Sequence, residues 1–373
     1  MTFESHVSEL ATPDAAAFLT LAERLRARPE REPAADLADR IMAALDAERA
    51  REQRRFRVPS PWWGAAAAAG LIAAVSLFDL ADRSRSAQTS VPQADGYAWL
   101  ASSQEADGTW SPAKHGGAEA YRPALTALSA LALARAPRPY APQLQRACSA
   151  LAAFQTADGA FGGEGRAQLY NHAITTYALA SLNRGYPSLK PVLERALDFI
   201  RSRQTAEGGW DYDPRSEGNA ALTAWQVRAL ACAEAQGFDR AKEPLRKGLR
   251  WLRGSLRDDG SIAYHRSSLA RSDSLTALAA YTLITAGKDF PGLPELGRQA
   301  TRSLGVPSET DRSSDCYRDY AKALAYDSAG AVGQAAAVRR QMLKHQELGC
   351  RDQWEPVGGK LYTTALTMLA AKP

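Results

Sequence analysis

The sequence predicts an all-α protein, an α/α toroid in which about six helical hairpins form an inner and an outer ring. One transmembrane helix and a short N-terminal helical segment precede it. Three observations predict this fold. A glutamine–glycine–aromatic motif recurs with a period near 50 residues, and a threonine-centred motif recurs in step with it. One segment near the N-terminus, uncharged over residues 62–78 and extended past Asp79 to Ala81, is just long enough to cross a bilayer.

The first motif ends an apolar helix each time it occurs. Its copies read QEADGTW (104–110), QTADGAF (155–161), QTAEGGW (204–210) and, more faintly, LRDDGSI (256–262). We assign the motif to architecture, because glutamine can bond the free backbone groups of a helix end, glycine eases a tight turn and an aromatic ring can pack on the next repeat. The residues given this structural role are Gln104, Gly108, Trp110, Gln155, Gly159, Phe161, Gln204, Gly208, Trp210 and Gly260.

The second motif opens the helix that follows each copy of the first. It reads YRPALTAL (121–128), YNHAITTY (170–177), GNAALTAW (218–225), RSDSLTAL (271–278), YRDYAKAL (317–324) and YTTALTML (362–369). Its aligned column holds Thr126, Thr175, Thr223, Thr276, Lys322 and Thr367. These second helices are apolar on every face, which places them in the inner ring, whereas the first helices carry charge on one side and suit the outer ring.

The segments before the repeats predict a membrane anchor. Residues 59–81 contain WWGAAAAAGLIAAVSLF, with five arginines between 49 and 57 on its N-terminal side. Excess arginine marks the cytoplasmic flank, so we expect residues 1–58 inside, a single span at 59–81, a linker at 82–95 and the repeats, 96–373, outside. A buried or interfacial helix is the alternative for this alanine-rich segment.

Composition excludes several classes of function. The net charge of +5 is spread along the chain, so we expect no nucleic-acid partner. The four cysteines, Cys148, Cys232, Cys316 and Cys350, form no metal-binding pair, and their disulfide state stays open. We expect no metal and no cofactor.

Both repeated motifs, and several longer stretches of sequence, resemble those of a known protein family. The first motif resembles the QW motifs of squalene–hopene cyclases. Residues 96–373 resemble bacterial prenyltransferase and squalene-oxidase repeat proteins of the terpenoid cyclase/protein prenyltransferase toroid superfamily. The closest phrases are QLYNHAITTYALA (168–180), EGGWDYDP (207–214), ALTAWQVRAL (221–230) and QWEPVGGKLYTTAL (353–366). The resemblance implies a central apolar cavity, which holds isoprenoids in the enzymes of the group. Since the similar repeat proteins are bacterial, we expect the predicted anchor to lie in the inner membrane and the toroid in the periplasm.

The catalytic motifs of those enzymes are not matched. The cyclases use a DxDD cluster to keep one carboxyl protonated, and the nearest match, residues 211–214, lacks the fourth acid. The prenyltransferases bind zinc through Asp, Cys and His. Here Asp315 and Cys316 are adjacent rather than separated by one residue, and Tyr362 occupies the histidine position. The thioester motif GCGEQ of the complement-type toroids is also missing.

Residues at the starts of the inner helices are the candidates for a ligand site, because a closed ring would bring them to one mouth. The weak catalytic candidates are His172, Asp273 and Asp319, for which helix capping is the alternative role. Anionic groups would suit the helix N-termini at this mouth. The expected ligand-binding residues are Tyr121, Tyr170, His172, Trp225, Asp273, Tyr317 and Tyr362, with His265 a weaker candidate.

Three functions remain open from the sequence. The first is a membrane-anchored toroid that binds an apolar or isoprenoid-like ligand. The second is a prenyltransferase or cyclase-type enzyme with a divergent site. The third is a membrane-bound regulator, because PAADLADRIMAAL (33–45) faintly resembles the juxtamembrane region of anti-sigma factors. In that case residues 1–58 would bind a cytoplasmic protein partner.

Overall fold

The structure, a computed structural model, describes residues 93–163, 165–213, 215–268, 270–305, 315–348 and 355–371. These residues all belong to one compact unit. No helix among these described residues is long and apolar enough to cross a membrane. The predicted cytoplasmic segment and membrane span, residues 1–81, lie outside the described residues.

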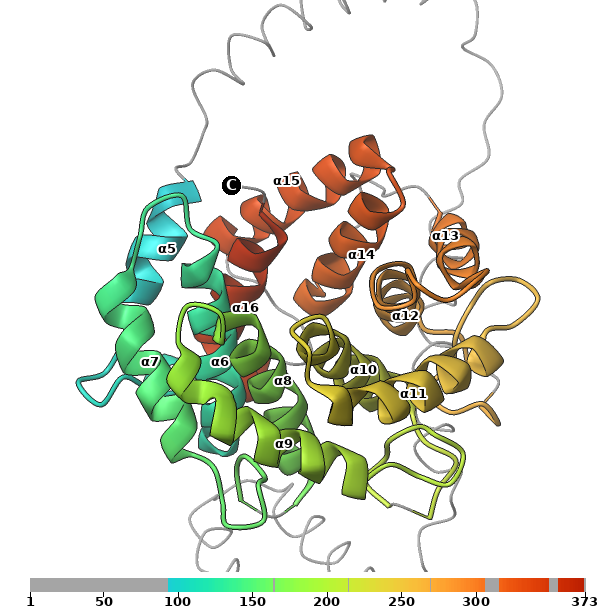
Figure 1. Cartoon of the computed structure of the whole chain (residues 1–373). Coiled ribbons are helices and arrows are strands. Elements are labelled where there is room, and N and C mark those ends of the chain that lie inside the picture. Colours follow the sequence, from blue (N-terminus) through green and yellow to red (C-terminus); the bar gives the residue numbers. More distant parts are fainter. Residues whose placement is uncertain are drawn as a thin grey trace, which may run out of the picture. The chain divides into compact units, whose positions relative to one another are not determined.

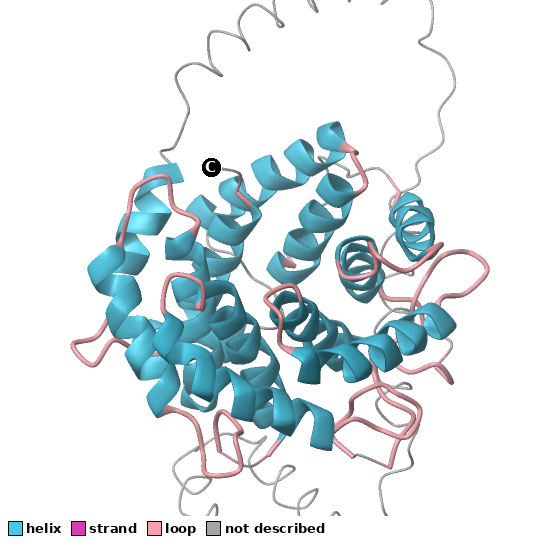
Figure 2. Cartoon of the chain, in the orientation of Figure 1, coloured by secondary structure: helices cyan, strands magenta, loops and turns pink. Residues whose placement is uncertain are grey.

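In the described part of the chain the elements are helices joined by loops, as predicted, with no named strand (Figure 2). Outer and inner helices alternate along the sequence. The outer helices are α5 (Gln93–Ser102), α7 (Ala141–Ala153), α9 (Lys190–Ser202), α11 (Lys242–Ser255), α13 (Leu293–Arg302) and α15 (Val332–Leu348). The inner helices are α6 (Arg122–Ala134), α8 (Arg166–Leu182), α10 (Ala220–Glu234), α12 (Asp273–Thr285), α14 (Cys316–Ser328) and α16 (Glu355–Ala370).

The inner helices form a closed ring. Each packs against the next, from α6 to α16, and α16 packs against α6 (Figure 1). Burial follows the sequence pattern. Residues 123–133 of α6 are all buried, whereas α11 buries Leu245, Leu249 and Leu252 and exposes Arg246 and Arg250. The predicted assignment of apolar helices to the inside and amphipathic helices to the outside is therefore confirmed.

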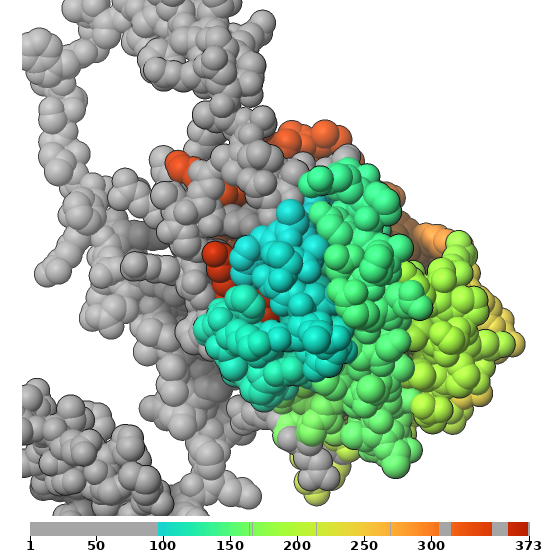
Figure 3. Space-filling view, turned by 90° about the vertical axis from the view of Figure 1, so that its left-hand side faces the viewer, coloured from blue at the N-terminus to red at the C-terminus, as the bar shows by residue number. Residues whose placement is uncertain are grey.

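The ring is closed where the first and last helices meet. The Tyr97 hydroxyl donates a hydrogen bond of 3.1 Å to the Met368 carbonyl oxygen. In the space-filling view, part of the red surface of the last helix adjoins the cyan surface of α5 (Figure 3). A kink at Gly359, with φ of 61°, brings the start of α16 against the turn that contains His115. A side chain at Gly359 would collide with the His115 carbonyl.

The glutamine of the first motif joins consecutive outer helices. Its Nε2 donates both to the carbonyl of the motif glycine and to a carbonyl in the first turn of the next outer helix. For Gln204 these acceptors are Gly208 O at 2.9 Å and Pro244 O at 3.0 Å. The other pairs are Gly108 O and Gln143 O for Gln104, and Gly159 O and Val192 O for Gln155.

The rest of the motif completes this junction. Gly159 has φ of 90° and lies against the Arg195 carbonyl, where a side chain would not fit. The indole nitrogen of Trp210 donates to Ile200 O at 2.8 Å, in the last turn of α9, and its backbone N–H donates to Thr223 Oγ1 at 3.0 Å. The threonine column of the inner helices thus binds the turn before it, a role that Thr126 and Thr276 share.

Candidate functional site

Aromatic side chains meet inside the ring near the N-terminal ends of the inner helices. The rings of Tyr170 and Tyr212 lie 6.4 Å apart, and Tyr212 hydrogen-bonds to Tyr170 and Tyr264. Trp225 Nε1 donates a 2.9 Å hydrogen bond to the Tyr317 hydroxyl. Burial raises the pKa of Tyr170 and of Tyr317, so both phenols stay neutral.

A second aromatic group surrounds Arg228, one turn further along α10. The guanidinium carbon lies 4.2 Å from the ring centre of Trp225, 4.6 Å from that of Tyr177 and 5.1 Å from that of Tyr281. Arg228 Nη2 also donates to the Tyr320 hydroxyl at 3.1 Å. We call the two groups together the interior aromatic cluster: Tyr170, Tyr177, Tyr212, Trp225, Tyr264, Tyr281, Tyr317 and Tyr320.

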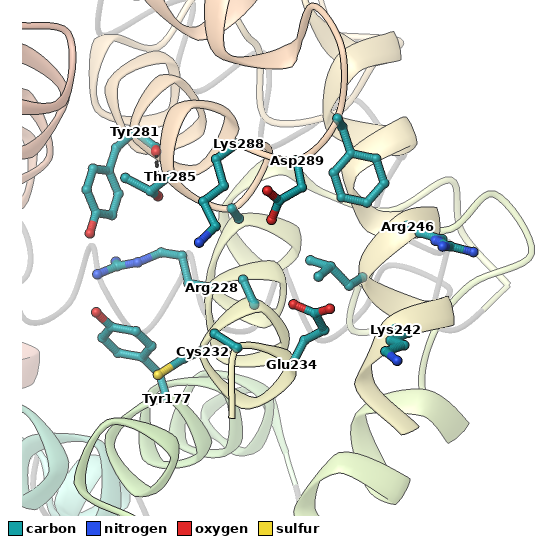
Figure 4. A pocket seen from close by; sticks show the side chains of 15 residues that line it. Tyr177, Arg228, Cys232, Glu234, Lys242, Arg246, Tyr281, Thr285, Lys288 and Asp289 are labelled. Atoms are coloured by element: carbon teal, nitrogen blue, oxygen red, sulfur yellow. Dashed lines mark hydrogen bonds between the residues drawn. The ribbon is translucent and has the colours of Figure 1, made fainter. Parts of the chain in front are cut away.

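A cavity of about 450 Å³ reaches this cluster between the C-terminal ends of α10 and α12. In Figure 4 the Arg228 side chain extends between the rings of Tyr177 and Tyr281 at one end of the cavity, while Lys242 and Arg246 lie at the other, on α11. The volume falls in the range of small-molecule sites.

Sequence reasoning found part of this arrangement. Trp225, Tyr170 and Tyr317 come together as expected ligand-binding residues of one ring, and Tyr121 lies close enough to Tyr212 to influence its pKa. Six contributors were missed: Tyr177, Tyr212, Arg228, Tyr264, Tyr281 and Tyr320. The signal for Arg228 was present, since it is the only charged residue within α10 before its last turn.

His172 lies in the wall of the ring rather than at its mouth. The side chain is 0% exposed, between the rings of Phe161 and Phe199, and Nε2 contacts Ala196 O of the outer helix α9 at 3.1 Å. Burial lowers the pKa of His172 to about 3. The imidazole is therefore a neutral part of the packing between α8 and α9, and the structure does not bring it to Asp273.

Asp273 and Asp319 come together around Lys322. Lys322 Nζ lies 2.9 Å from Asp273 Oδ2, and its charge also acts on Asp319. Asp319 is 4% exposed and accepts a 3.1 Å hydrogen bond from Arg318 Nε. Burial raises the pKa of Asp319 to about 6. The lysine that replaces threonine in the aligned column therefore compensates a carboxylate of the neighbouring inner helix.

Several inner-helix starts are capped by side chains. Asn219, Ser272 and Asp315 accept backbone N–H groups of α10, α12 and α14, respectively. These caps reduce the number of N–H groups that could hold an anion at this mouth.

The carboxylates of the incomplete acid motif organise their own loop. Asp211 accepts hydrogen bonds from the Tyr212 backbone, Ser216 and Asn219, and the exposed Asp213 pairs with Arg215. His265 contacts Gly218 O at 3.2 Å in the same region. Among the described residues no group of three or more His, Cys, Asp and Glu side chains could hold a metal ion. The described cysteines, Cys148, Cys232 and Cys316, are free thiols.

Two family models match the sequence. The squalene-hopene cyclase C-terminal domain matches residues 123–268. The prenyltransferase alpha-alpha toroid domain matches residues 17–186. Both matches agree with the family resemblance that the repeat motifs carry. No curated protein sequence matches it.

Solved structures share the fold of this toroid protein at low sequence identity. The α-1,6-mannanase GH76A of Salegentibacter sp. HEL1_6, in complex with α-1,6-mannotriose, has a TM-score of 0.54 and 11% identity over 75% of this chain and 98% of its own. The type II terpene cyclase MstE from Scytonema has a TM-score of 0.42 and 18% identity over 67% of this chain and 71% of its own. The likeness to the mannanase shows the fold alone.

Proposed function

We propose that this toroid protein is a membrane-anchored binding protein that holds an apolar, isoprenoid-like ligand inside its inner ring. The observation that carries the proposal is the interior aromatic cluster. It presents aromatic faces from α8, α10, α12 and α14 toward one interior, and a cavity reaches it from the surface. Aromatic side chains supply large apolar contact areas with fixed geometry, which suits an extended hydrocarbon.

Binding without cyclisation fits the chemistry of the cluster better than catalysis does. Its ionisable members are phenols, and burial raises the pKa of Tyr281 to about 12. A phenol of this kind is too weak an acid to protonate an alkene. The carboxylates of the incomplete DxDD match, Asp211 and Asp213, accept hydrogen bonds in their own loop. The predicted anchor at residues 59–81 would place the toroid at the membrane surface, close to lipid-like ligands.

Native mass spectrometry of the full-length protein extracted in mild detergent tests this proposal. We expect a co-purifying isoprenoid-like molecule, and a rise in melting temperature when geranylgeraniol is added to stripped protein. Trp225→Ala should reduce both signals. Val332→Ala, at an exposed position of α15, is the matched control and should behave as the wild type. The proposal would be overturned if isoprenoid alcohols did not change the melting temperature of wild-type protein from which lipid had been removed.

A divergent enzyme is the second candidate, and Asp319 is the observation that favours it. A buried carboxyl with a pKa of about 6 remains partly protonated near neutral pH and could donate a proton. If a reaction is found, its rate should fall as pH rises through about 6, and Asp319→Asn should abolish it. Turnover that survives this substitution would exclude Asp319 as the acid. The regulatory alternative depends on residues 1–58 and stays a prediction.

A further inference from the structure

Arg228 is a buried cation whose hydrogen bonds are incomplete. Its side chain is 3% exposed, yet neither Nε nor Nη1 has a hydrogen-bond partner within the described residues. Only Nη2 is bonded, to the Tyr320 hydroxyl. A guanidinium carries five N–H donors and stays charged at every physiological pH. Burying such a group is unfavourable unless charge and donors are compensated.

The surroundings compensate the charge only in part. Three aromatic rings lie within 5.1 Å of the guanidinium carbon and attract the cation through their faces. A ring face does not replace an acceptor for the N–H groups. The described ion pairs include none with Arg228. The last carbonyls of α10, residues 231–234, accept hydrogen bonds from residues 235–237. The N–H groups at Nε and Nη1 of Arg228 therefore have no oxygen acceptor among the described residues.

The cavity supplies both access and a favourable potential. Arg228 lines it at the inner end, beside Tyr177 and Tyr281 (Figure 4). Four basic side chains line the whole cavity against two acidic ones. The basic ones are Arg228, Lys242, Arg246 and Lys288, and the acidic ones are Glu234 and Asp289. Lys242, the first residue of α11, also forms an ion pair of 2.7 Å with Asp239.

We propose that Arg228 binds an oxyanion, the carboxylate or phosphate group of a ligand that enters through this cavity. Both groups accept charge-assisted hydrogen bonds from guanidinium N–H donors. The aromatic rings around Arg228 would then contact the carbon chain next to the anionic group. The inference rests on the proposed function for the apolar part of the ligand, which makes the ligand an anionic amphiphile, but the anion site is testable on its own.

Full-length protein is titrated with inorganic phosphate, hexyl phosphate, hexanoate and hexanol, and melting temperature and affinity are recorded. We expect hexyl phosphate or hexanoate to raise the melting temperature more than hexanol. Arg228→Met should weaken anion binding by about 10- to 100-fold, the value of one charged hydrogen-bonded contact. Arg250→Met, on the exposed face of α11 outside the cavity, is the matched control and should bind anions as the wild type does.

The ligand-free melting temperature gives a second readout. Arg228→Met should raise it, because a buried charge with free donors is replaced by an apolar side chain. If Arg228 serves only to hold Tyr320 and the rings, the same substitution should lower it, and the proposal would be wrong. If Arg228→Met does not fold, Arg228→Lys keeps the charge with fewer donors and should weaken anion binding while retaining the fold.

The outcomes separate this inference from the proposed function. Equal responses to hexanol and to the anions in all variants would overturn the anion site and leave apolar binding intact. Phosphate binding that depends on Arg228, without tighter binding of the six-carbon probes, would support the anion site and contradict the proposed function. A preference for hexyl phosphate over hexanoate, or the reverse, identifies which oxyanion the site takes.

Discussion

The Trp225 indole donates a 2.9 Å hydrogen bond to the Tyr317 hydroxyl, joining inner helices α10 and α14, which are separated in the ring by α12. The bond crosses the interior rather than running along the wall. It therefore fixes the separation of two helices that are not neighbours, and with it the width of the space available to a ligand.

Removing either partner of this hydrogen bond should lower the unfolding free energy by a similar amount. We expect Trp225→Phe and Tyr317→Phe each to destabilise the fold, with a coupling energy of about 1 kcal/mol in a double-mutant cycle, the net value of a buried hydrogen bond. Urea unfolding of the four proteins measures it. A coupling energy near zero would mean that the two side chains do not share a bond in solution.

The glutamine of the first motif should stabilise the fold through its hydrogen bonds to two carbonyl acceptors. Gln204→Ala leaves the Gly208 and Pro244 carbonyls without their side-chain donor, and we expect a loss of about 1–3 kcal/mol in unfolding free energy. Gln145→Ala, at an exposed position of α7, is the control and should change stability by less than about 0.5 kcal/mol. Similar losses in both variants would mean that the motif glutamine does not stabilise the junction between consecutive outer helices.

Two glycines separate backbone strain from simple helix propensity. Gly159→Ala places a side chain against the Arg195 carbonyl at φ of 90°, so we expect a destabilisation above about 2 kcal/mol. Gly333→Ala lies in the outer helix α15 with open space around it and should stabilise the fold by about 0.5–1 kcal/mol. Thermal unfolding should shift in opposite directions for the two variants, and a shift in the same direction would contradict the assigned geometry.

Two buried groups should give opposite dependences of stability on pH. The pKa of His172 is lowered to about 3 from 6.5, so its contribution is present above pH 6.5 and is lost as pH falls toward 3. The pKa of Asp319 is raised to about 6 from 3.8, so its contribution is present below pH 3.8 and is lost as pH rises toward 6. Between about pH 4 and 6 the two slopes oppose each other, each at most about 1.4 kcal/mol per pH unit.

Single substitutions should reveal each slope in turn. Asp319→Asn should make the protein lose stability on acidification from pH 6 to 4, and His172→Gln should make it lose stability as pH rises over the same range. Chemical unfolding at half-unit steps of pH, with the wild type alongside, measures both. If both variants kept the wild-type profile, these side chains would not titrate as their burial implies.

The repeats made the fold predictable, because a period near 50 residues and two motifs in register define both the hairpins and their order. The glutamine and glycine roles also follow from helix-end chemistry. The indole of Trp210 was expected to pack on the next repeat, and its ring lies against Gly248 of α11. Its nitrogen also bonds the last turn of its own outer helix, at Ile200, which the motif did not predict. Sequence gives the residue type at such a junction, while the acceptor depends on how the loop folds back.

The site was less predictable, because a position along a helix does not fix the direction of its side chain. His172 lies two residues after Tyr170 on α8, yet it points into the wall beside Phe199 while Tyr170 contacts Tyr212. An inner helix buried all round has no hydrophobic stripe to indicate which side faces the interior. Arg228 is the exception, because a charged residue inside a buried helix indicates a specific site. The aligned repeats do not show which groups surround that charge.

The contact between Tyr97 and Met368 bears on how the domain is made. The strongest packing around the inner ring joins helices close in sequence, whereas this contact joins residues 271 positions apart. Local hairpins can therefore form as the chain emerges, and the circle is completed only after its final helix has been synthesised. A chain that stops before α16 would leave the apolar sides of α6 and α14 uncovered, so a late premature stop should be as damaging to this domain as an early one.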